Sequence, residues 1–147
     1  MTYPYEGNRQ VATMLRSLDR PVAILQAGAR YFHENLANGH FDGTLSGYWN
    51  YALEPMLDHI EAWQRGDVSE ATKIWNSGLL ELHDYMHSNG RLHIHYKIAA
   101  WLRGLVDRPY MRPPMPPPRE DEVETIYGLM KKVGIPVIGE KEKKIPG

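Results

Sequence analysis

The chain of 147 residues contains no cysteine, and no apolar run in it approaches the roughly 20 residues that a membrane-spanning helix needs. Without thiols, disulfide bonds and cysteine chemistry are excluded, and a reducing compartment is allowed but not required. The first ten residues also lack the basic and then apolar pattern of a signal peptide. These absences predict a cytoplasmic protein that does not contact a membrane.

Neither sign of charge is in excess. Lys and Arg total 17 and Asp and Glu total 18, which gives a net charge of −1 and no basic surface for nucleic acid. With 42% hydrophobic and 24% charged residues, the composition is that of an ordinary globular protein with one core. Residues 139–147, where lysine and glutamate alternate, are predicted to form a flexible tail.

Proline is concentrated in one segment, residues 109–118, which holds six of the 11 prolines. Such a run cannot be a helix or a central strand, so it is predicted to be an extended strap. Proline-rich segments are often linkers or ligands of SH3-type domains. However, Tyr110, Met111 and Met115 stand between these prolines and have apolar surface to bury. We therefore expect the strap to pack across its own protein.

Helical periodicity covers most of the chain. Apolar residues spaced three and four apart predict helices over residues 6–18, 31–36, 53–64, 68–87, 92–106 and 120–133. The first helix is expected to group Val11, Met14, Leu15 and Leu18 on one face, and the third to group Leu53, Met56, Leu57, Ile60 and Trp63. Gly39 and Gly134 are expected C-caps, and Asp67 is an expected N-cap.

Two short segments are predicted strands. Val22–Leu25 is continuously apolar and suits a strand that is buried on both faces of a parallel sheet, and residues 41–47 form a weaker candidate. We expect the two strands to be parallel neighbours. Two strands alone leave open edges, which favour pairing with another chain.

Histidines offer a separate candidate chemistry. His83 and His87 are four residues apart on one helix, a spacing that can hold zinc, and His93 and His95 follow closely. Asp84 stands where the HExxH motif has glutamate, and His95 lies on an inward face, where a hydrogen-bonded core histidine is the simpler interpretation. A metal-binding protein therefore stays an alternative. The acidic residues 120–122 are interpreted as a helix N-terminus.

Four segments, taken in chain order, resemble segments of a known protein family. They are Gly43-Thr44-Leu45-Ser46, the Gly66-Asp67 junction, the helix containing Tyr96-Lys97-Ile98, and Arg112-Pro113-Pro114. Over residues 8–138 the chain resembles the C-terminal end of the dihydrodipicolinate synthase / N-acetylneuraminate lyase family. The resemblance implies a helix-dominated α/β fold: the last two βα units of a (β/α)8 TIM barrel in residues 1–66, and a three-helix C-terminal region in residues 67–138.

The resemblance also implies a chemistry. Family members are lyases, aldolases and dehydratases that bind pyruvate as a Schiff base on a lysine of the sixth barrel strand. No lysine precedes Lys73, and Lys73 and Lys97 fall in the C-terminal helices. The resemblance thus implies a portion that lacks the nucleophile and is inactive alone, so whether the chain itself is an enzyme stays open. No cofactor is expected.

The residues that follow the two strands are those that the resemblance assigns to the wall of the substrate pocket: Gln26, Ala27, Gly28, Ser46, Gly47 and Asn50. They would approach a keto acid, mostly through backbone, once the barrel is complete. Where many members have Gly-Asp-(Asp/Glu), this chain has Gln26-Ala27-Gly28-Ala29, which leaves the substrate open. The expected partner is a missing N-terminal barrel portion or a second copy. The alternative function is a non-enzymatic helical module that oligomerises.

Overall fold

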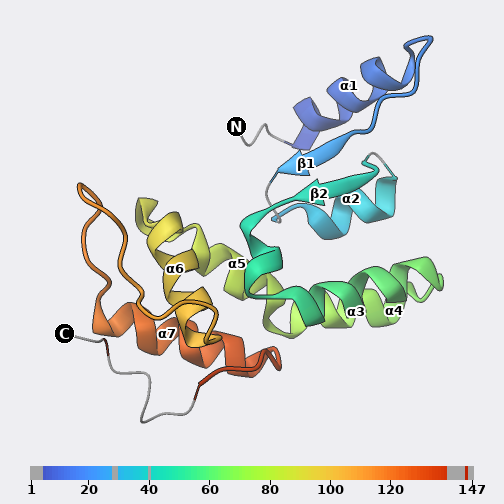
Figure 1. Ribbon diagram of the computed structural model, residues 1–147. Coiled ribbons are helices and arrows are strands. Elements are labelled where there is room, and N and C mark those ends of the chain that lie inside the picture. The colour runs from blue at the N-terminus through green and yellow to red at the C-terminus, as the bar shows by residue number, and fades with distance from the viewer. Residues whose placement is uncertain (1–4, 28–29, 40, 139–144, 146–147) are drawn as a thin grey trace.

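Helices dominate the computed structural model in Figure 1, which describes residues 5–27, 30–39, 41–138 and 145. The elements are α1 Tyr5–Arg16, β1 Leu25–Ala27, α2 Phe32–Asn38, β2 Gly43–Leu45, the 3-10 helix η1 Gly47–Asn50, α3 Leu53–Gln64, α4 Val68–Ile74, the π-helix η2 Trp75–Leu79, α5 Leu80–Met86, the 3-10 turn η3 Ser88–Gly90, α6 Leu92–Leu102 and α7 Glu120–Lys132. The predicted flexible tail, 139–147, lies outside the described residues except for Ile145. No helix in the described part is long and apolar enough to cross a membrane.

The sheet consists of β1 and β2, which pair in parallel with Leu25 opposite Gly43 and Ala27 opposite Leu45. The expected pairing of neighbouring parallel strands is confirmed. The expected position and double burial of the first strand are wrong, because the strand begins only at Leu25 and its side chains alternate between buried and exposed. Leu25 is 58% exposed and Leu45 is 71% exposed. One face of the sheet is therefore uncovered by the part of the chain described.

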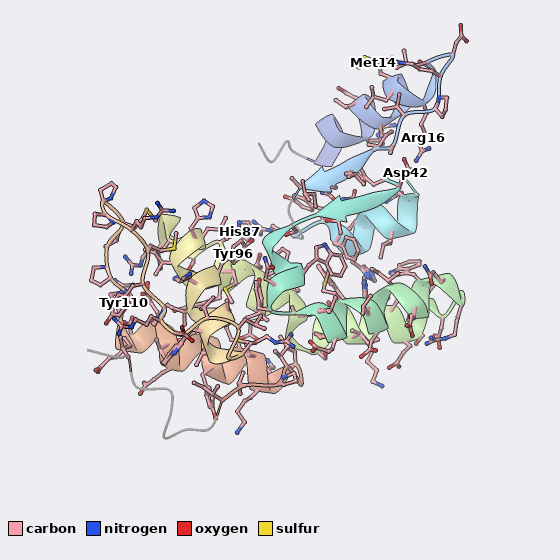
Figure 2. The ribbon with its side chains drawn as sticks, viewed as in Figure 1. Met14, Arg16, Asp42, His87, Tyr96 and Tyr110 are labelled. Atoms are coloured by element: carbon pink, nitrogen blue, oxygen red, sulfur yellow. The ribbon has the colours of Figure 1, made fainter. Side chains whose placement is uncertain are left out.

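Helix α1 lies beside the sheet and is joined to its start by an ion pair (Figures 1 and 2). Arg16 Nη2 is 3.1 Å from Asp42 Oδ1, and Asp42 Oδ2 also accepts a hydrogen bond from the Ile24 amide at 2.8 Å. The apolar stripe predicted for this helix exists but is largely exposed, and Met14 is the most exposed of its residues. Ala12 is buried instead. Helix α1 thus exposes apolar side chains, as the sheet does.

The large buried side chains come mainly from the elements after β2. Those that are fully buried are Tyr48, Tyr51, Met56, His59, Leu79, Leu82, Met86, Ile94, Ile98, Leu102, Ile126 and Met130. In α3 the predicted inward residues Leu53 and Leu57 are exposed, and Met56, His59 and Ala62 form the buried face. Met56 is buried as predicted, whereas His59 was missed because hydrophobic periodicity counts histidine as polar.

The single helix predicted over residues 68–87 is interrupted by the π-turn η2. Asp67 caps its start as expected, since its Oδ1 accepts the Glu70 amide hydrogen at 3.0 Å. Gly78 then has a φ of 137°, which L-residues rarely adopt. A Cβ at Gly78 would also lie 2.9 Å from Val133 Cγ1. Glycine at this position therefore permits both the backbone turn and the close approach of the residue that follows α7.

Helix α6 ends at Leu102, four residues before its predicted end. Gly104 has a φ of 74°, and the amides of Gly104 and Leu105 donate back to the carbonyls of Trp101 and Ala100. Leu105, which falls within the predicted helix over residues 92–106, therefore lies outside α6 and is 58% exposed.

The proline-rich strap that follows α6 packs on its own protein, as predicted. Met111 and Met115 are partly buried against the core, and Arg91 Nη2 donates to the Pro117 carbonyl at 2.9 Å. The strap is thus held by side chains from the helical region, and it leads directly into α7.

Candidate functional site

The carboxyl end of the small sheet is the first place to look for a site. Gln26 and Ala27 end β1, and Ser46 and Gly47 follow β2 directly, so four of the predicted site residues lie at one edge of two paired strands. Gly28 lies outside the described residues. This arrangement brings the backbone of both strand ends to one edge of the sheet.

The side chain of Gln26 does not face that edge. It is buried, and its Oε1 accepts a hydrogen bond from Asn35 Nδ2 of α2. Ala27 is exposed, and Asn50 is an exposed residue at the end of η1. Of the side chains predicted for this wall, Ser46 is the polar one that sits at the strand end itself.

Ser46 and Gly47 are covered by a residue that the sequence did not indicate. Tyr96 of α6 places its ring against the Gly47 backbone, so close that a Cβ on Gly47 would lie 2.3 Å from Tyr96 Cε2. Ser46 Oγ caps η1 by accepting the Tyr48 amide hydrogen at 3.4 Å. Burial raises the pKa of Tyr96, and the hydroxyls of Ser46 and Tyr48 partly oppose that rise. The Tyr96 ring and the Ser46 cap therefore lie together just past the end of β2.

Tyr48 is the centre of an aromatic and imidazole cluster. Its ring centroid lies 3.5 Å from that of His83, 5.6 Å from Tyr51, 6.0 Å from Tyr96 and 6.1 Å from His87. Burial raises the pKa of both Tyr48 and Tyr51, so their phenols stay protonated at neutral pH. In Figure 2, Tyr96 and His87 lie at the end of β2 where η1 begins.

A second group of rings lies between α2 and α3. His33 Nδ1 is 2.9 Å from His59 Nε2, and both rings contact Trp75 of η2. Burial, reinforced by His33, lowers the pKa of His59 to about 4, and burial lowers the pKa of His83 as well. His59 Nδ1 and both ring nitrogens of His83 have no hydrogen-bond partner among the described residues. Both rings are therefore neutral and cannot be protonated without a large cost.

The four histidines singled out in the sequence do not form one site. His83 is buried against Tyr48, while His87 and His93 are exposed. His95 is a hydrogen-bonded core histidine, as the simpler interpretation had it, with Nδ1 3.1 Å from the Met86 carbonyl and Nε2 3.3 Å from Glu122 Oε1. No group of three or more metal-ligating side chains that could hold an ion occurs in the described ranges. The geometry therefore gives the metal-binding alternative no support.

Glu122 forms a buried ion pair that the sequence analysis missed. It belongs to the helix N-terminus that was predicted, but its side chain is also fully buried and pairs with Arg91. Burial would raise the pKa of Glu122, but hydrogen bonds from Arg91 and from the Arg119 amide outweigh it and lower the pKa to about 2. No local spacing in the sequence points to Arg91, which lies 31 residues before Glu122. This network holds α6, the strap and α7 together.

Both lysines considered in the sequence lie on helices rather than on a strand. Lys73 of α4 is exposed and pairs with Glu70 Oε2 at 3.1 Å, and Lys97 lies on α6. An exposed, paired ammonium lacks the desolvation that activates a nucleophilic lysine.

Comparison with known proteins identifies the family to which the chain belongs. The fold is helix-dominated with a small parallel sheet, and the model of the dihydrodipicolinate synthetase family matches residues 6–133, so the chain belongs to that family. The chain is also 36% identical over 93 residues to a 4-hydroxy-tetrahydrodipicolinate synthase of Methanopyrus kandleri. That match covers 63% of this chain and 30% of the Methanopyrus protein. The chain therefore spans about a third of the length of this curated relative.

Proposed function

We propose that the chain is the C-terminal portion of a pyruvate-dependent lyase, an aldolase or dehydratase. In this proposal β1–α2 and β2–α3 are the last two units of a (β/α)8 barrel within residues 1–66, and residues 67–138 form the helical region that follows. The observation that carries it is the parallel β1–β2 pair, which exposes the face with Leu25 and Leu45 although these are large apolar residues. In a closed barrel this face would point to the interior, where the side chains of further strands would cover it.

The chain would supply part of the pocket wall and no nucleophile. The carboxyl ends of barrel strands are where enzymes of this fold place their chemistry, and here those ends carry Ala27, Ser46 and Gly47. The lysine that forms the Schiff base with pyruvate would come from the remainder of the barrel. The chain alone is then inactive, and it binds a keto acid only within the complete barrel.

Trapping with borohydride and pyruvate tests this proposal. The chain is mixed with the part of the Methanopyrus relative that it does not match, treated with both reagents and analysed by mass spectrometry. We expect a pyruvate adduct on the partner in the mixture and none on this chain. A Leu45→Asp variant should prevent the assembly, whereas Leu57→Asp, at an exposed site on α3, is the matched control. A reduced adduct on this chain would show that the nucleophile lies here after all.

A second candidate function, a non-enzymatic module that assembles with itself, is favoured by the same exposed surface. Val11 and Met14 of α1 and Leu18 just after it add to the apolar area of the sheet, and exposed patches of this kind usually mark interaction sites. Light scattering separates the two candidates. A discrete homo-oligomer that persists when the barrel portion is added favours the module, whereas a one-to-one assembly with lyase activity favours the split enzyme.

A further inference from the structure

We propose that Arg30, in the loop between β1 and α2, binds the carboxylate of a second substrate, an aldehyde that carries an acidic group. This loop lies at the carboxyl end of β1, the end at which barrel enzymes place their chemistry. That the ligand is a substrate rests on the proposed function, in which a lyase joins an aldehyde to pyruvate. That Arg30 binds a carboxylate depends on this chain alone.

The order of charged residues along the chain is the first argument. Arg30 is the first charged residue after β1, and the first after β2 is the acidic Glu54 of α3. Because β1 and β2 are parallel neighbours, with Ala27 opposite Leu45, the residues that follow both strands lie at one edge of the sheet. Arg30 is therefore the cation closest in sequence to the carboxyl end of either strand, and the residues between it and β1 carry no charge that would repel an anion.

The guanidinium of Arg30 is oriented but not saturated. Its Nε lies 3.4 Å from Asp84 Oδ1 of α5, and the two side chains are 65% and 48% exposed. This ion pair is the contact that the structure gives the Arg30 side chain within the described residues, and a guanidinium has several further N–H donors. An exposed ion pair contributes little to stability, so a ligand can share Arg30 with Asp84 at small cost.

The neighbours of this ion pair connect it to the end of β2. Partial burial lowers the pKa of His87, Asp84 opposes that shift and Arg30 reinforces it, so both charges act on the His87 ring. The centroid of that ring lies 6.1 Å from the centroid of Tyr48 in η1, and Figure 2 shows His87 where β2 ends and η1 begins. A neutral imidazole there can donate a second hydrogen bond to an oxygen held by Arg30. The loop after β1 and the segment after β2 thus border one place.

The chemistry of the guanidinium selects the ligand. Its planar fork of N–H donors matches the two oxygens of a carboxylate, and such charge-assisted bonds are stronger than those to an uncharged carbonyl. A short aldehyde with a carboxylate at its far end could place that group on Arg30 while its carbonyl faces the pocket of the complete barrel. The same aldehyde as an ester would lose this contact, so Arg30 determines specificity rather than the reaction itself.

Carboxylate binding is tested on the chain alone by NMR titration with butyrate and with the uncharged butyramide. Butyrate should shift the Nε–H signal of Arg30 and the ring signals of His87 with a saturable, millimolar dependence, and butyramide should not. Arg30→Gln should abolish the shift at His87. Arg20→Gln, which removes an exposed arginine before β1, is the matched control and should retain it. A shift that does not saturate, or one that is equal at Arg20, would be a non-specific charge effect and would overturn the proposal.

The substrate part is tested in the assembly with the barrel portion, using pyruvate with succinic semialdehyde or with its methyl ester. Arg30→Gln should lower kcat/KM about tenfold for the acid and less than about twofold for the ester, the size expected for one charge-assisted contact. Equal losses for both aldehydes, or conversion of neither by an assembly that does form the pyruvate adduct, would refute the role in specificity. If the unaltered assembly forms no adduct, the proposed function fails, and the butyrate titration still decides whether Arg30 binds a carboxylate.

Discussion

Acid should destabilise this protein through His59, a buried histidine with one ring nitrogen that has no hydrogen-bond partner among the described residues. The side chain is fully buried, its Nε2 faces His33 Nδ1 at 2.9 Å, and its Nδ1 has no partner in the described part of the chain. Burial is the main cause that lowers the pKa of His59 from 6.5 to about 4, and His33 adds to it. The folded protein therefore binds a proton at this ring much less readily than the unfolded chain does.

The size of the effect follows from that difference. From 6.5 to about 4 is about 2.5 pKa units, and at about 1.4 kcal/mol per unit the contribution is about 3 kcal/mol. Above pH 6.5 neither state is protonated at His59, so the contribution is fully present. It is lost as pH falls from 6.5 toward 4, where the unfolded state binds the proton and the folded state does not. A loss of this size is a large fraction of the roughly 5–15 kcal/mol that stabilises a typical domain.

Urea unfolding followed by tryptophan fluorescence measures it, because Trp75 contacts His59. We expect the free energy of unfolding to fall by about 3 kcal/mol or more between pH 7 and pH 4, since His83 adds to the same slope. His59→Gln should be less stable at pH 7 but show a shallower slope, and exposed His93→Gln should keep the full slope. A slope in His59→Gln equal to that of the unaltered protein would refute the reasoning.

Three further outcomes are expected. Glu122→Gln leaves Arg91 without its buried carboxylate and should cost about 3–5 kcal/mol in urea unfolding, whereas the exposed Glu124→Gln should change little. Gly78→Ala should cost about 1–3 kcal/mol by calorimetry, because the residue has a φ of 137° and its new methyl would meet Val133. Leu45→Asp should leave the free energy of unfolding of the isolated chain nearly unchanged, because that side chain is exposed, and a marked loss would show that the sheet face is already covered.

Local backbone chemistry made part of the fold predictable. Gly39 was expected to end a helix and has a φ of 61°, and Asp67 was expected to start one and accepts the Glu70 amide hydrogen. The strap followed from proline alone, because the ring excludes helix whatever the tertiary context. Hydrophobic counting failed where a polar residue is buried, as with His59 in α3, and where a glycine with positive φ, Gly104, ends a helix early.

Only the part of the candidate site that lies at the strand ends could be predicted from the sequence. The family resemblance singled out Ser46 and Gly47, and the structure places both directly after β2, where their position depends on neighbours in the sequence. Tyr96 was missed because its role depends on how α6 packs against η1, and no spacing within one helix encodes that contact. Glu122 was missed for the same reason, since its partner Arg91 is 31 residues away. Long-range contacts between elements thus carry the information that periodicity lacks.

The uneven burial along the chain connects these findings. The largest fully buried side chains begin at Tyr48, whereas the sheet exposes Leu25 and Leu45 and α1 exposes Met14. Two short strands are too few to stabilise a sheet by themselves, so this part of the chain depends on contacts that the described residues do not supply. Barrel completion and self-association both supply such contacts, and they differ only in which chain covers the sheet. In the proposed barrel, Ser46 and Gly47 would lie at the carboxyl ends of the strands, where enzymes of that fold place their substrate pocket.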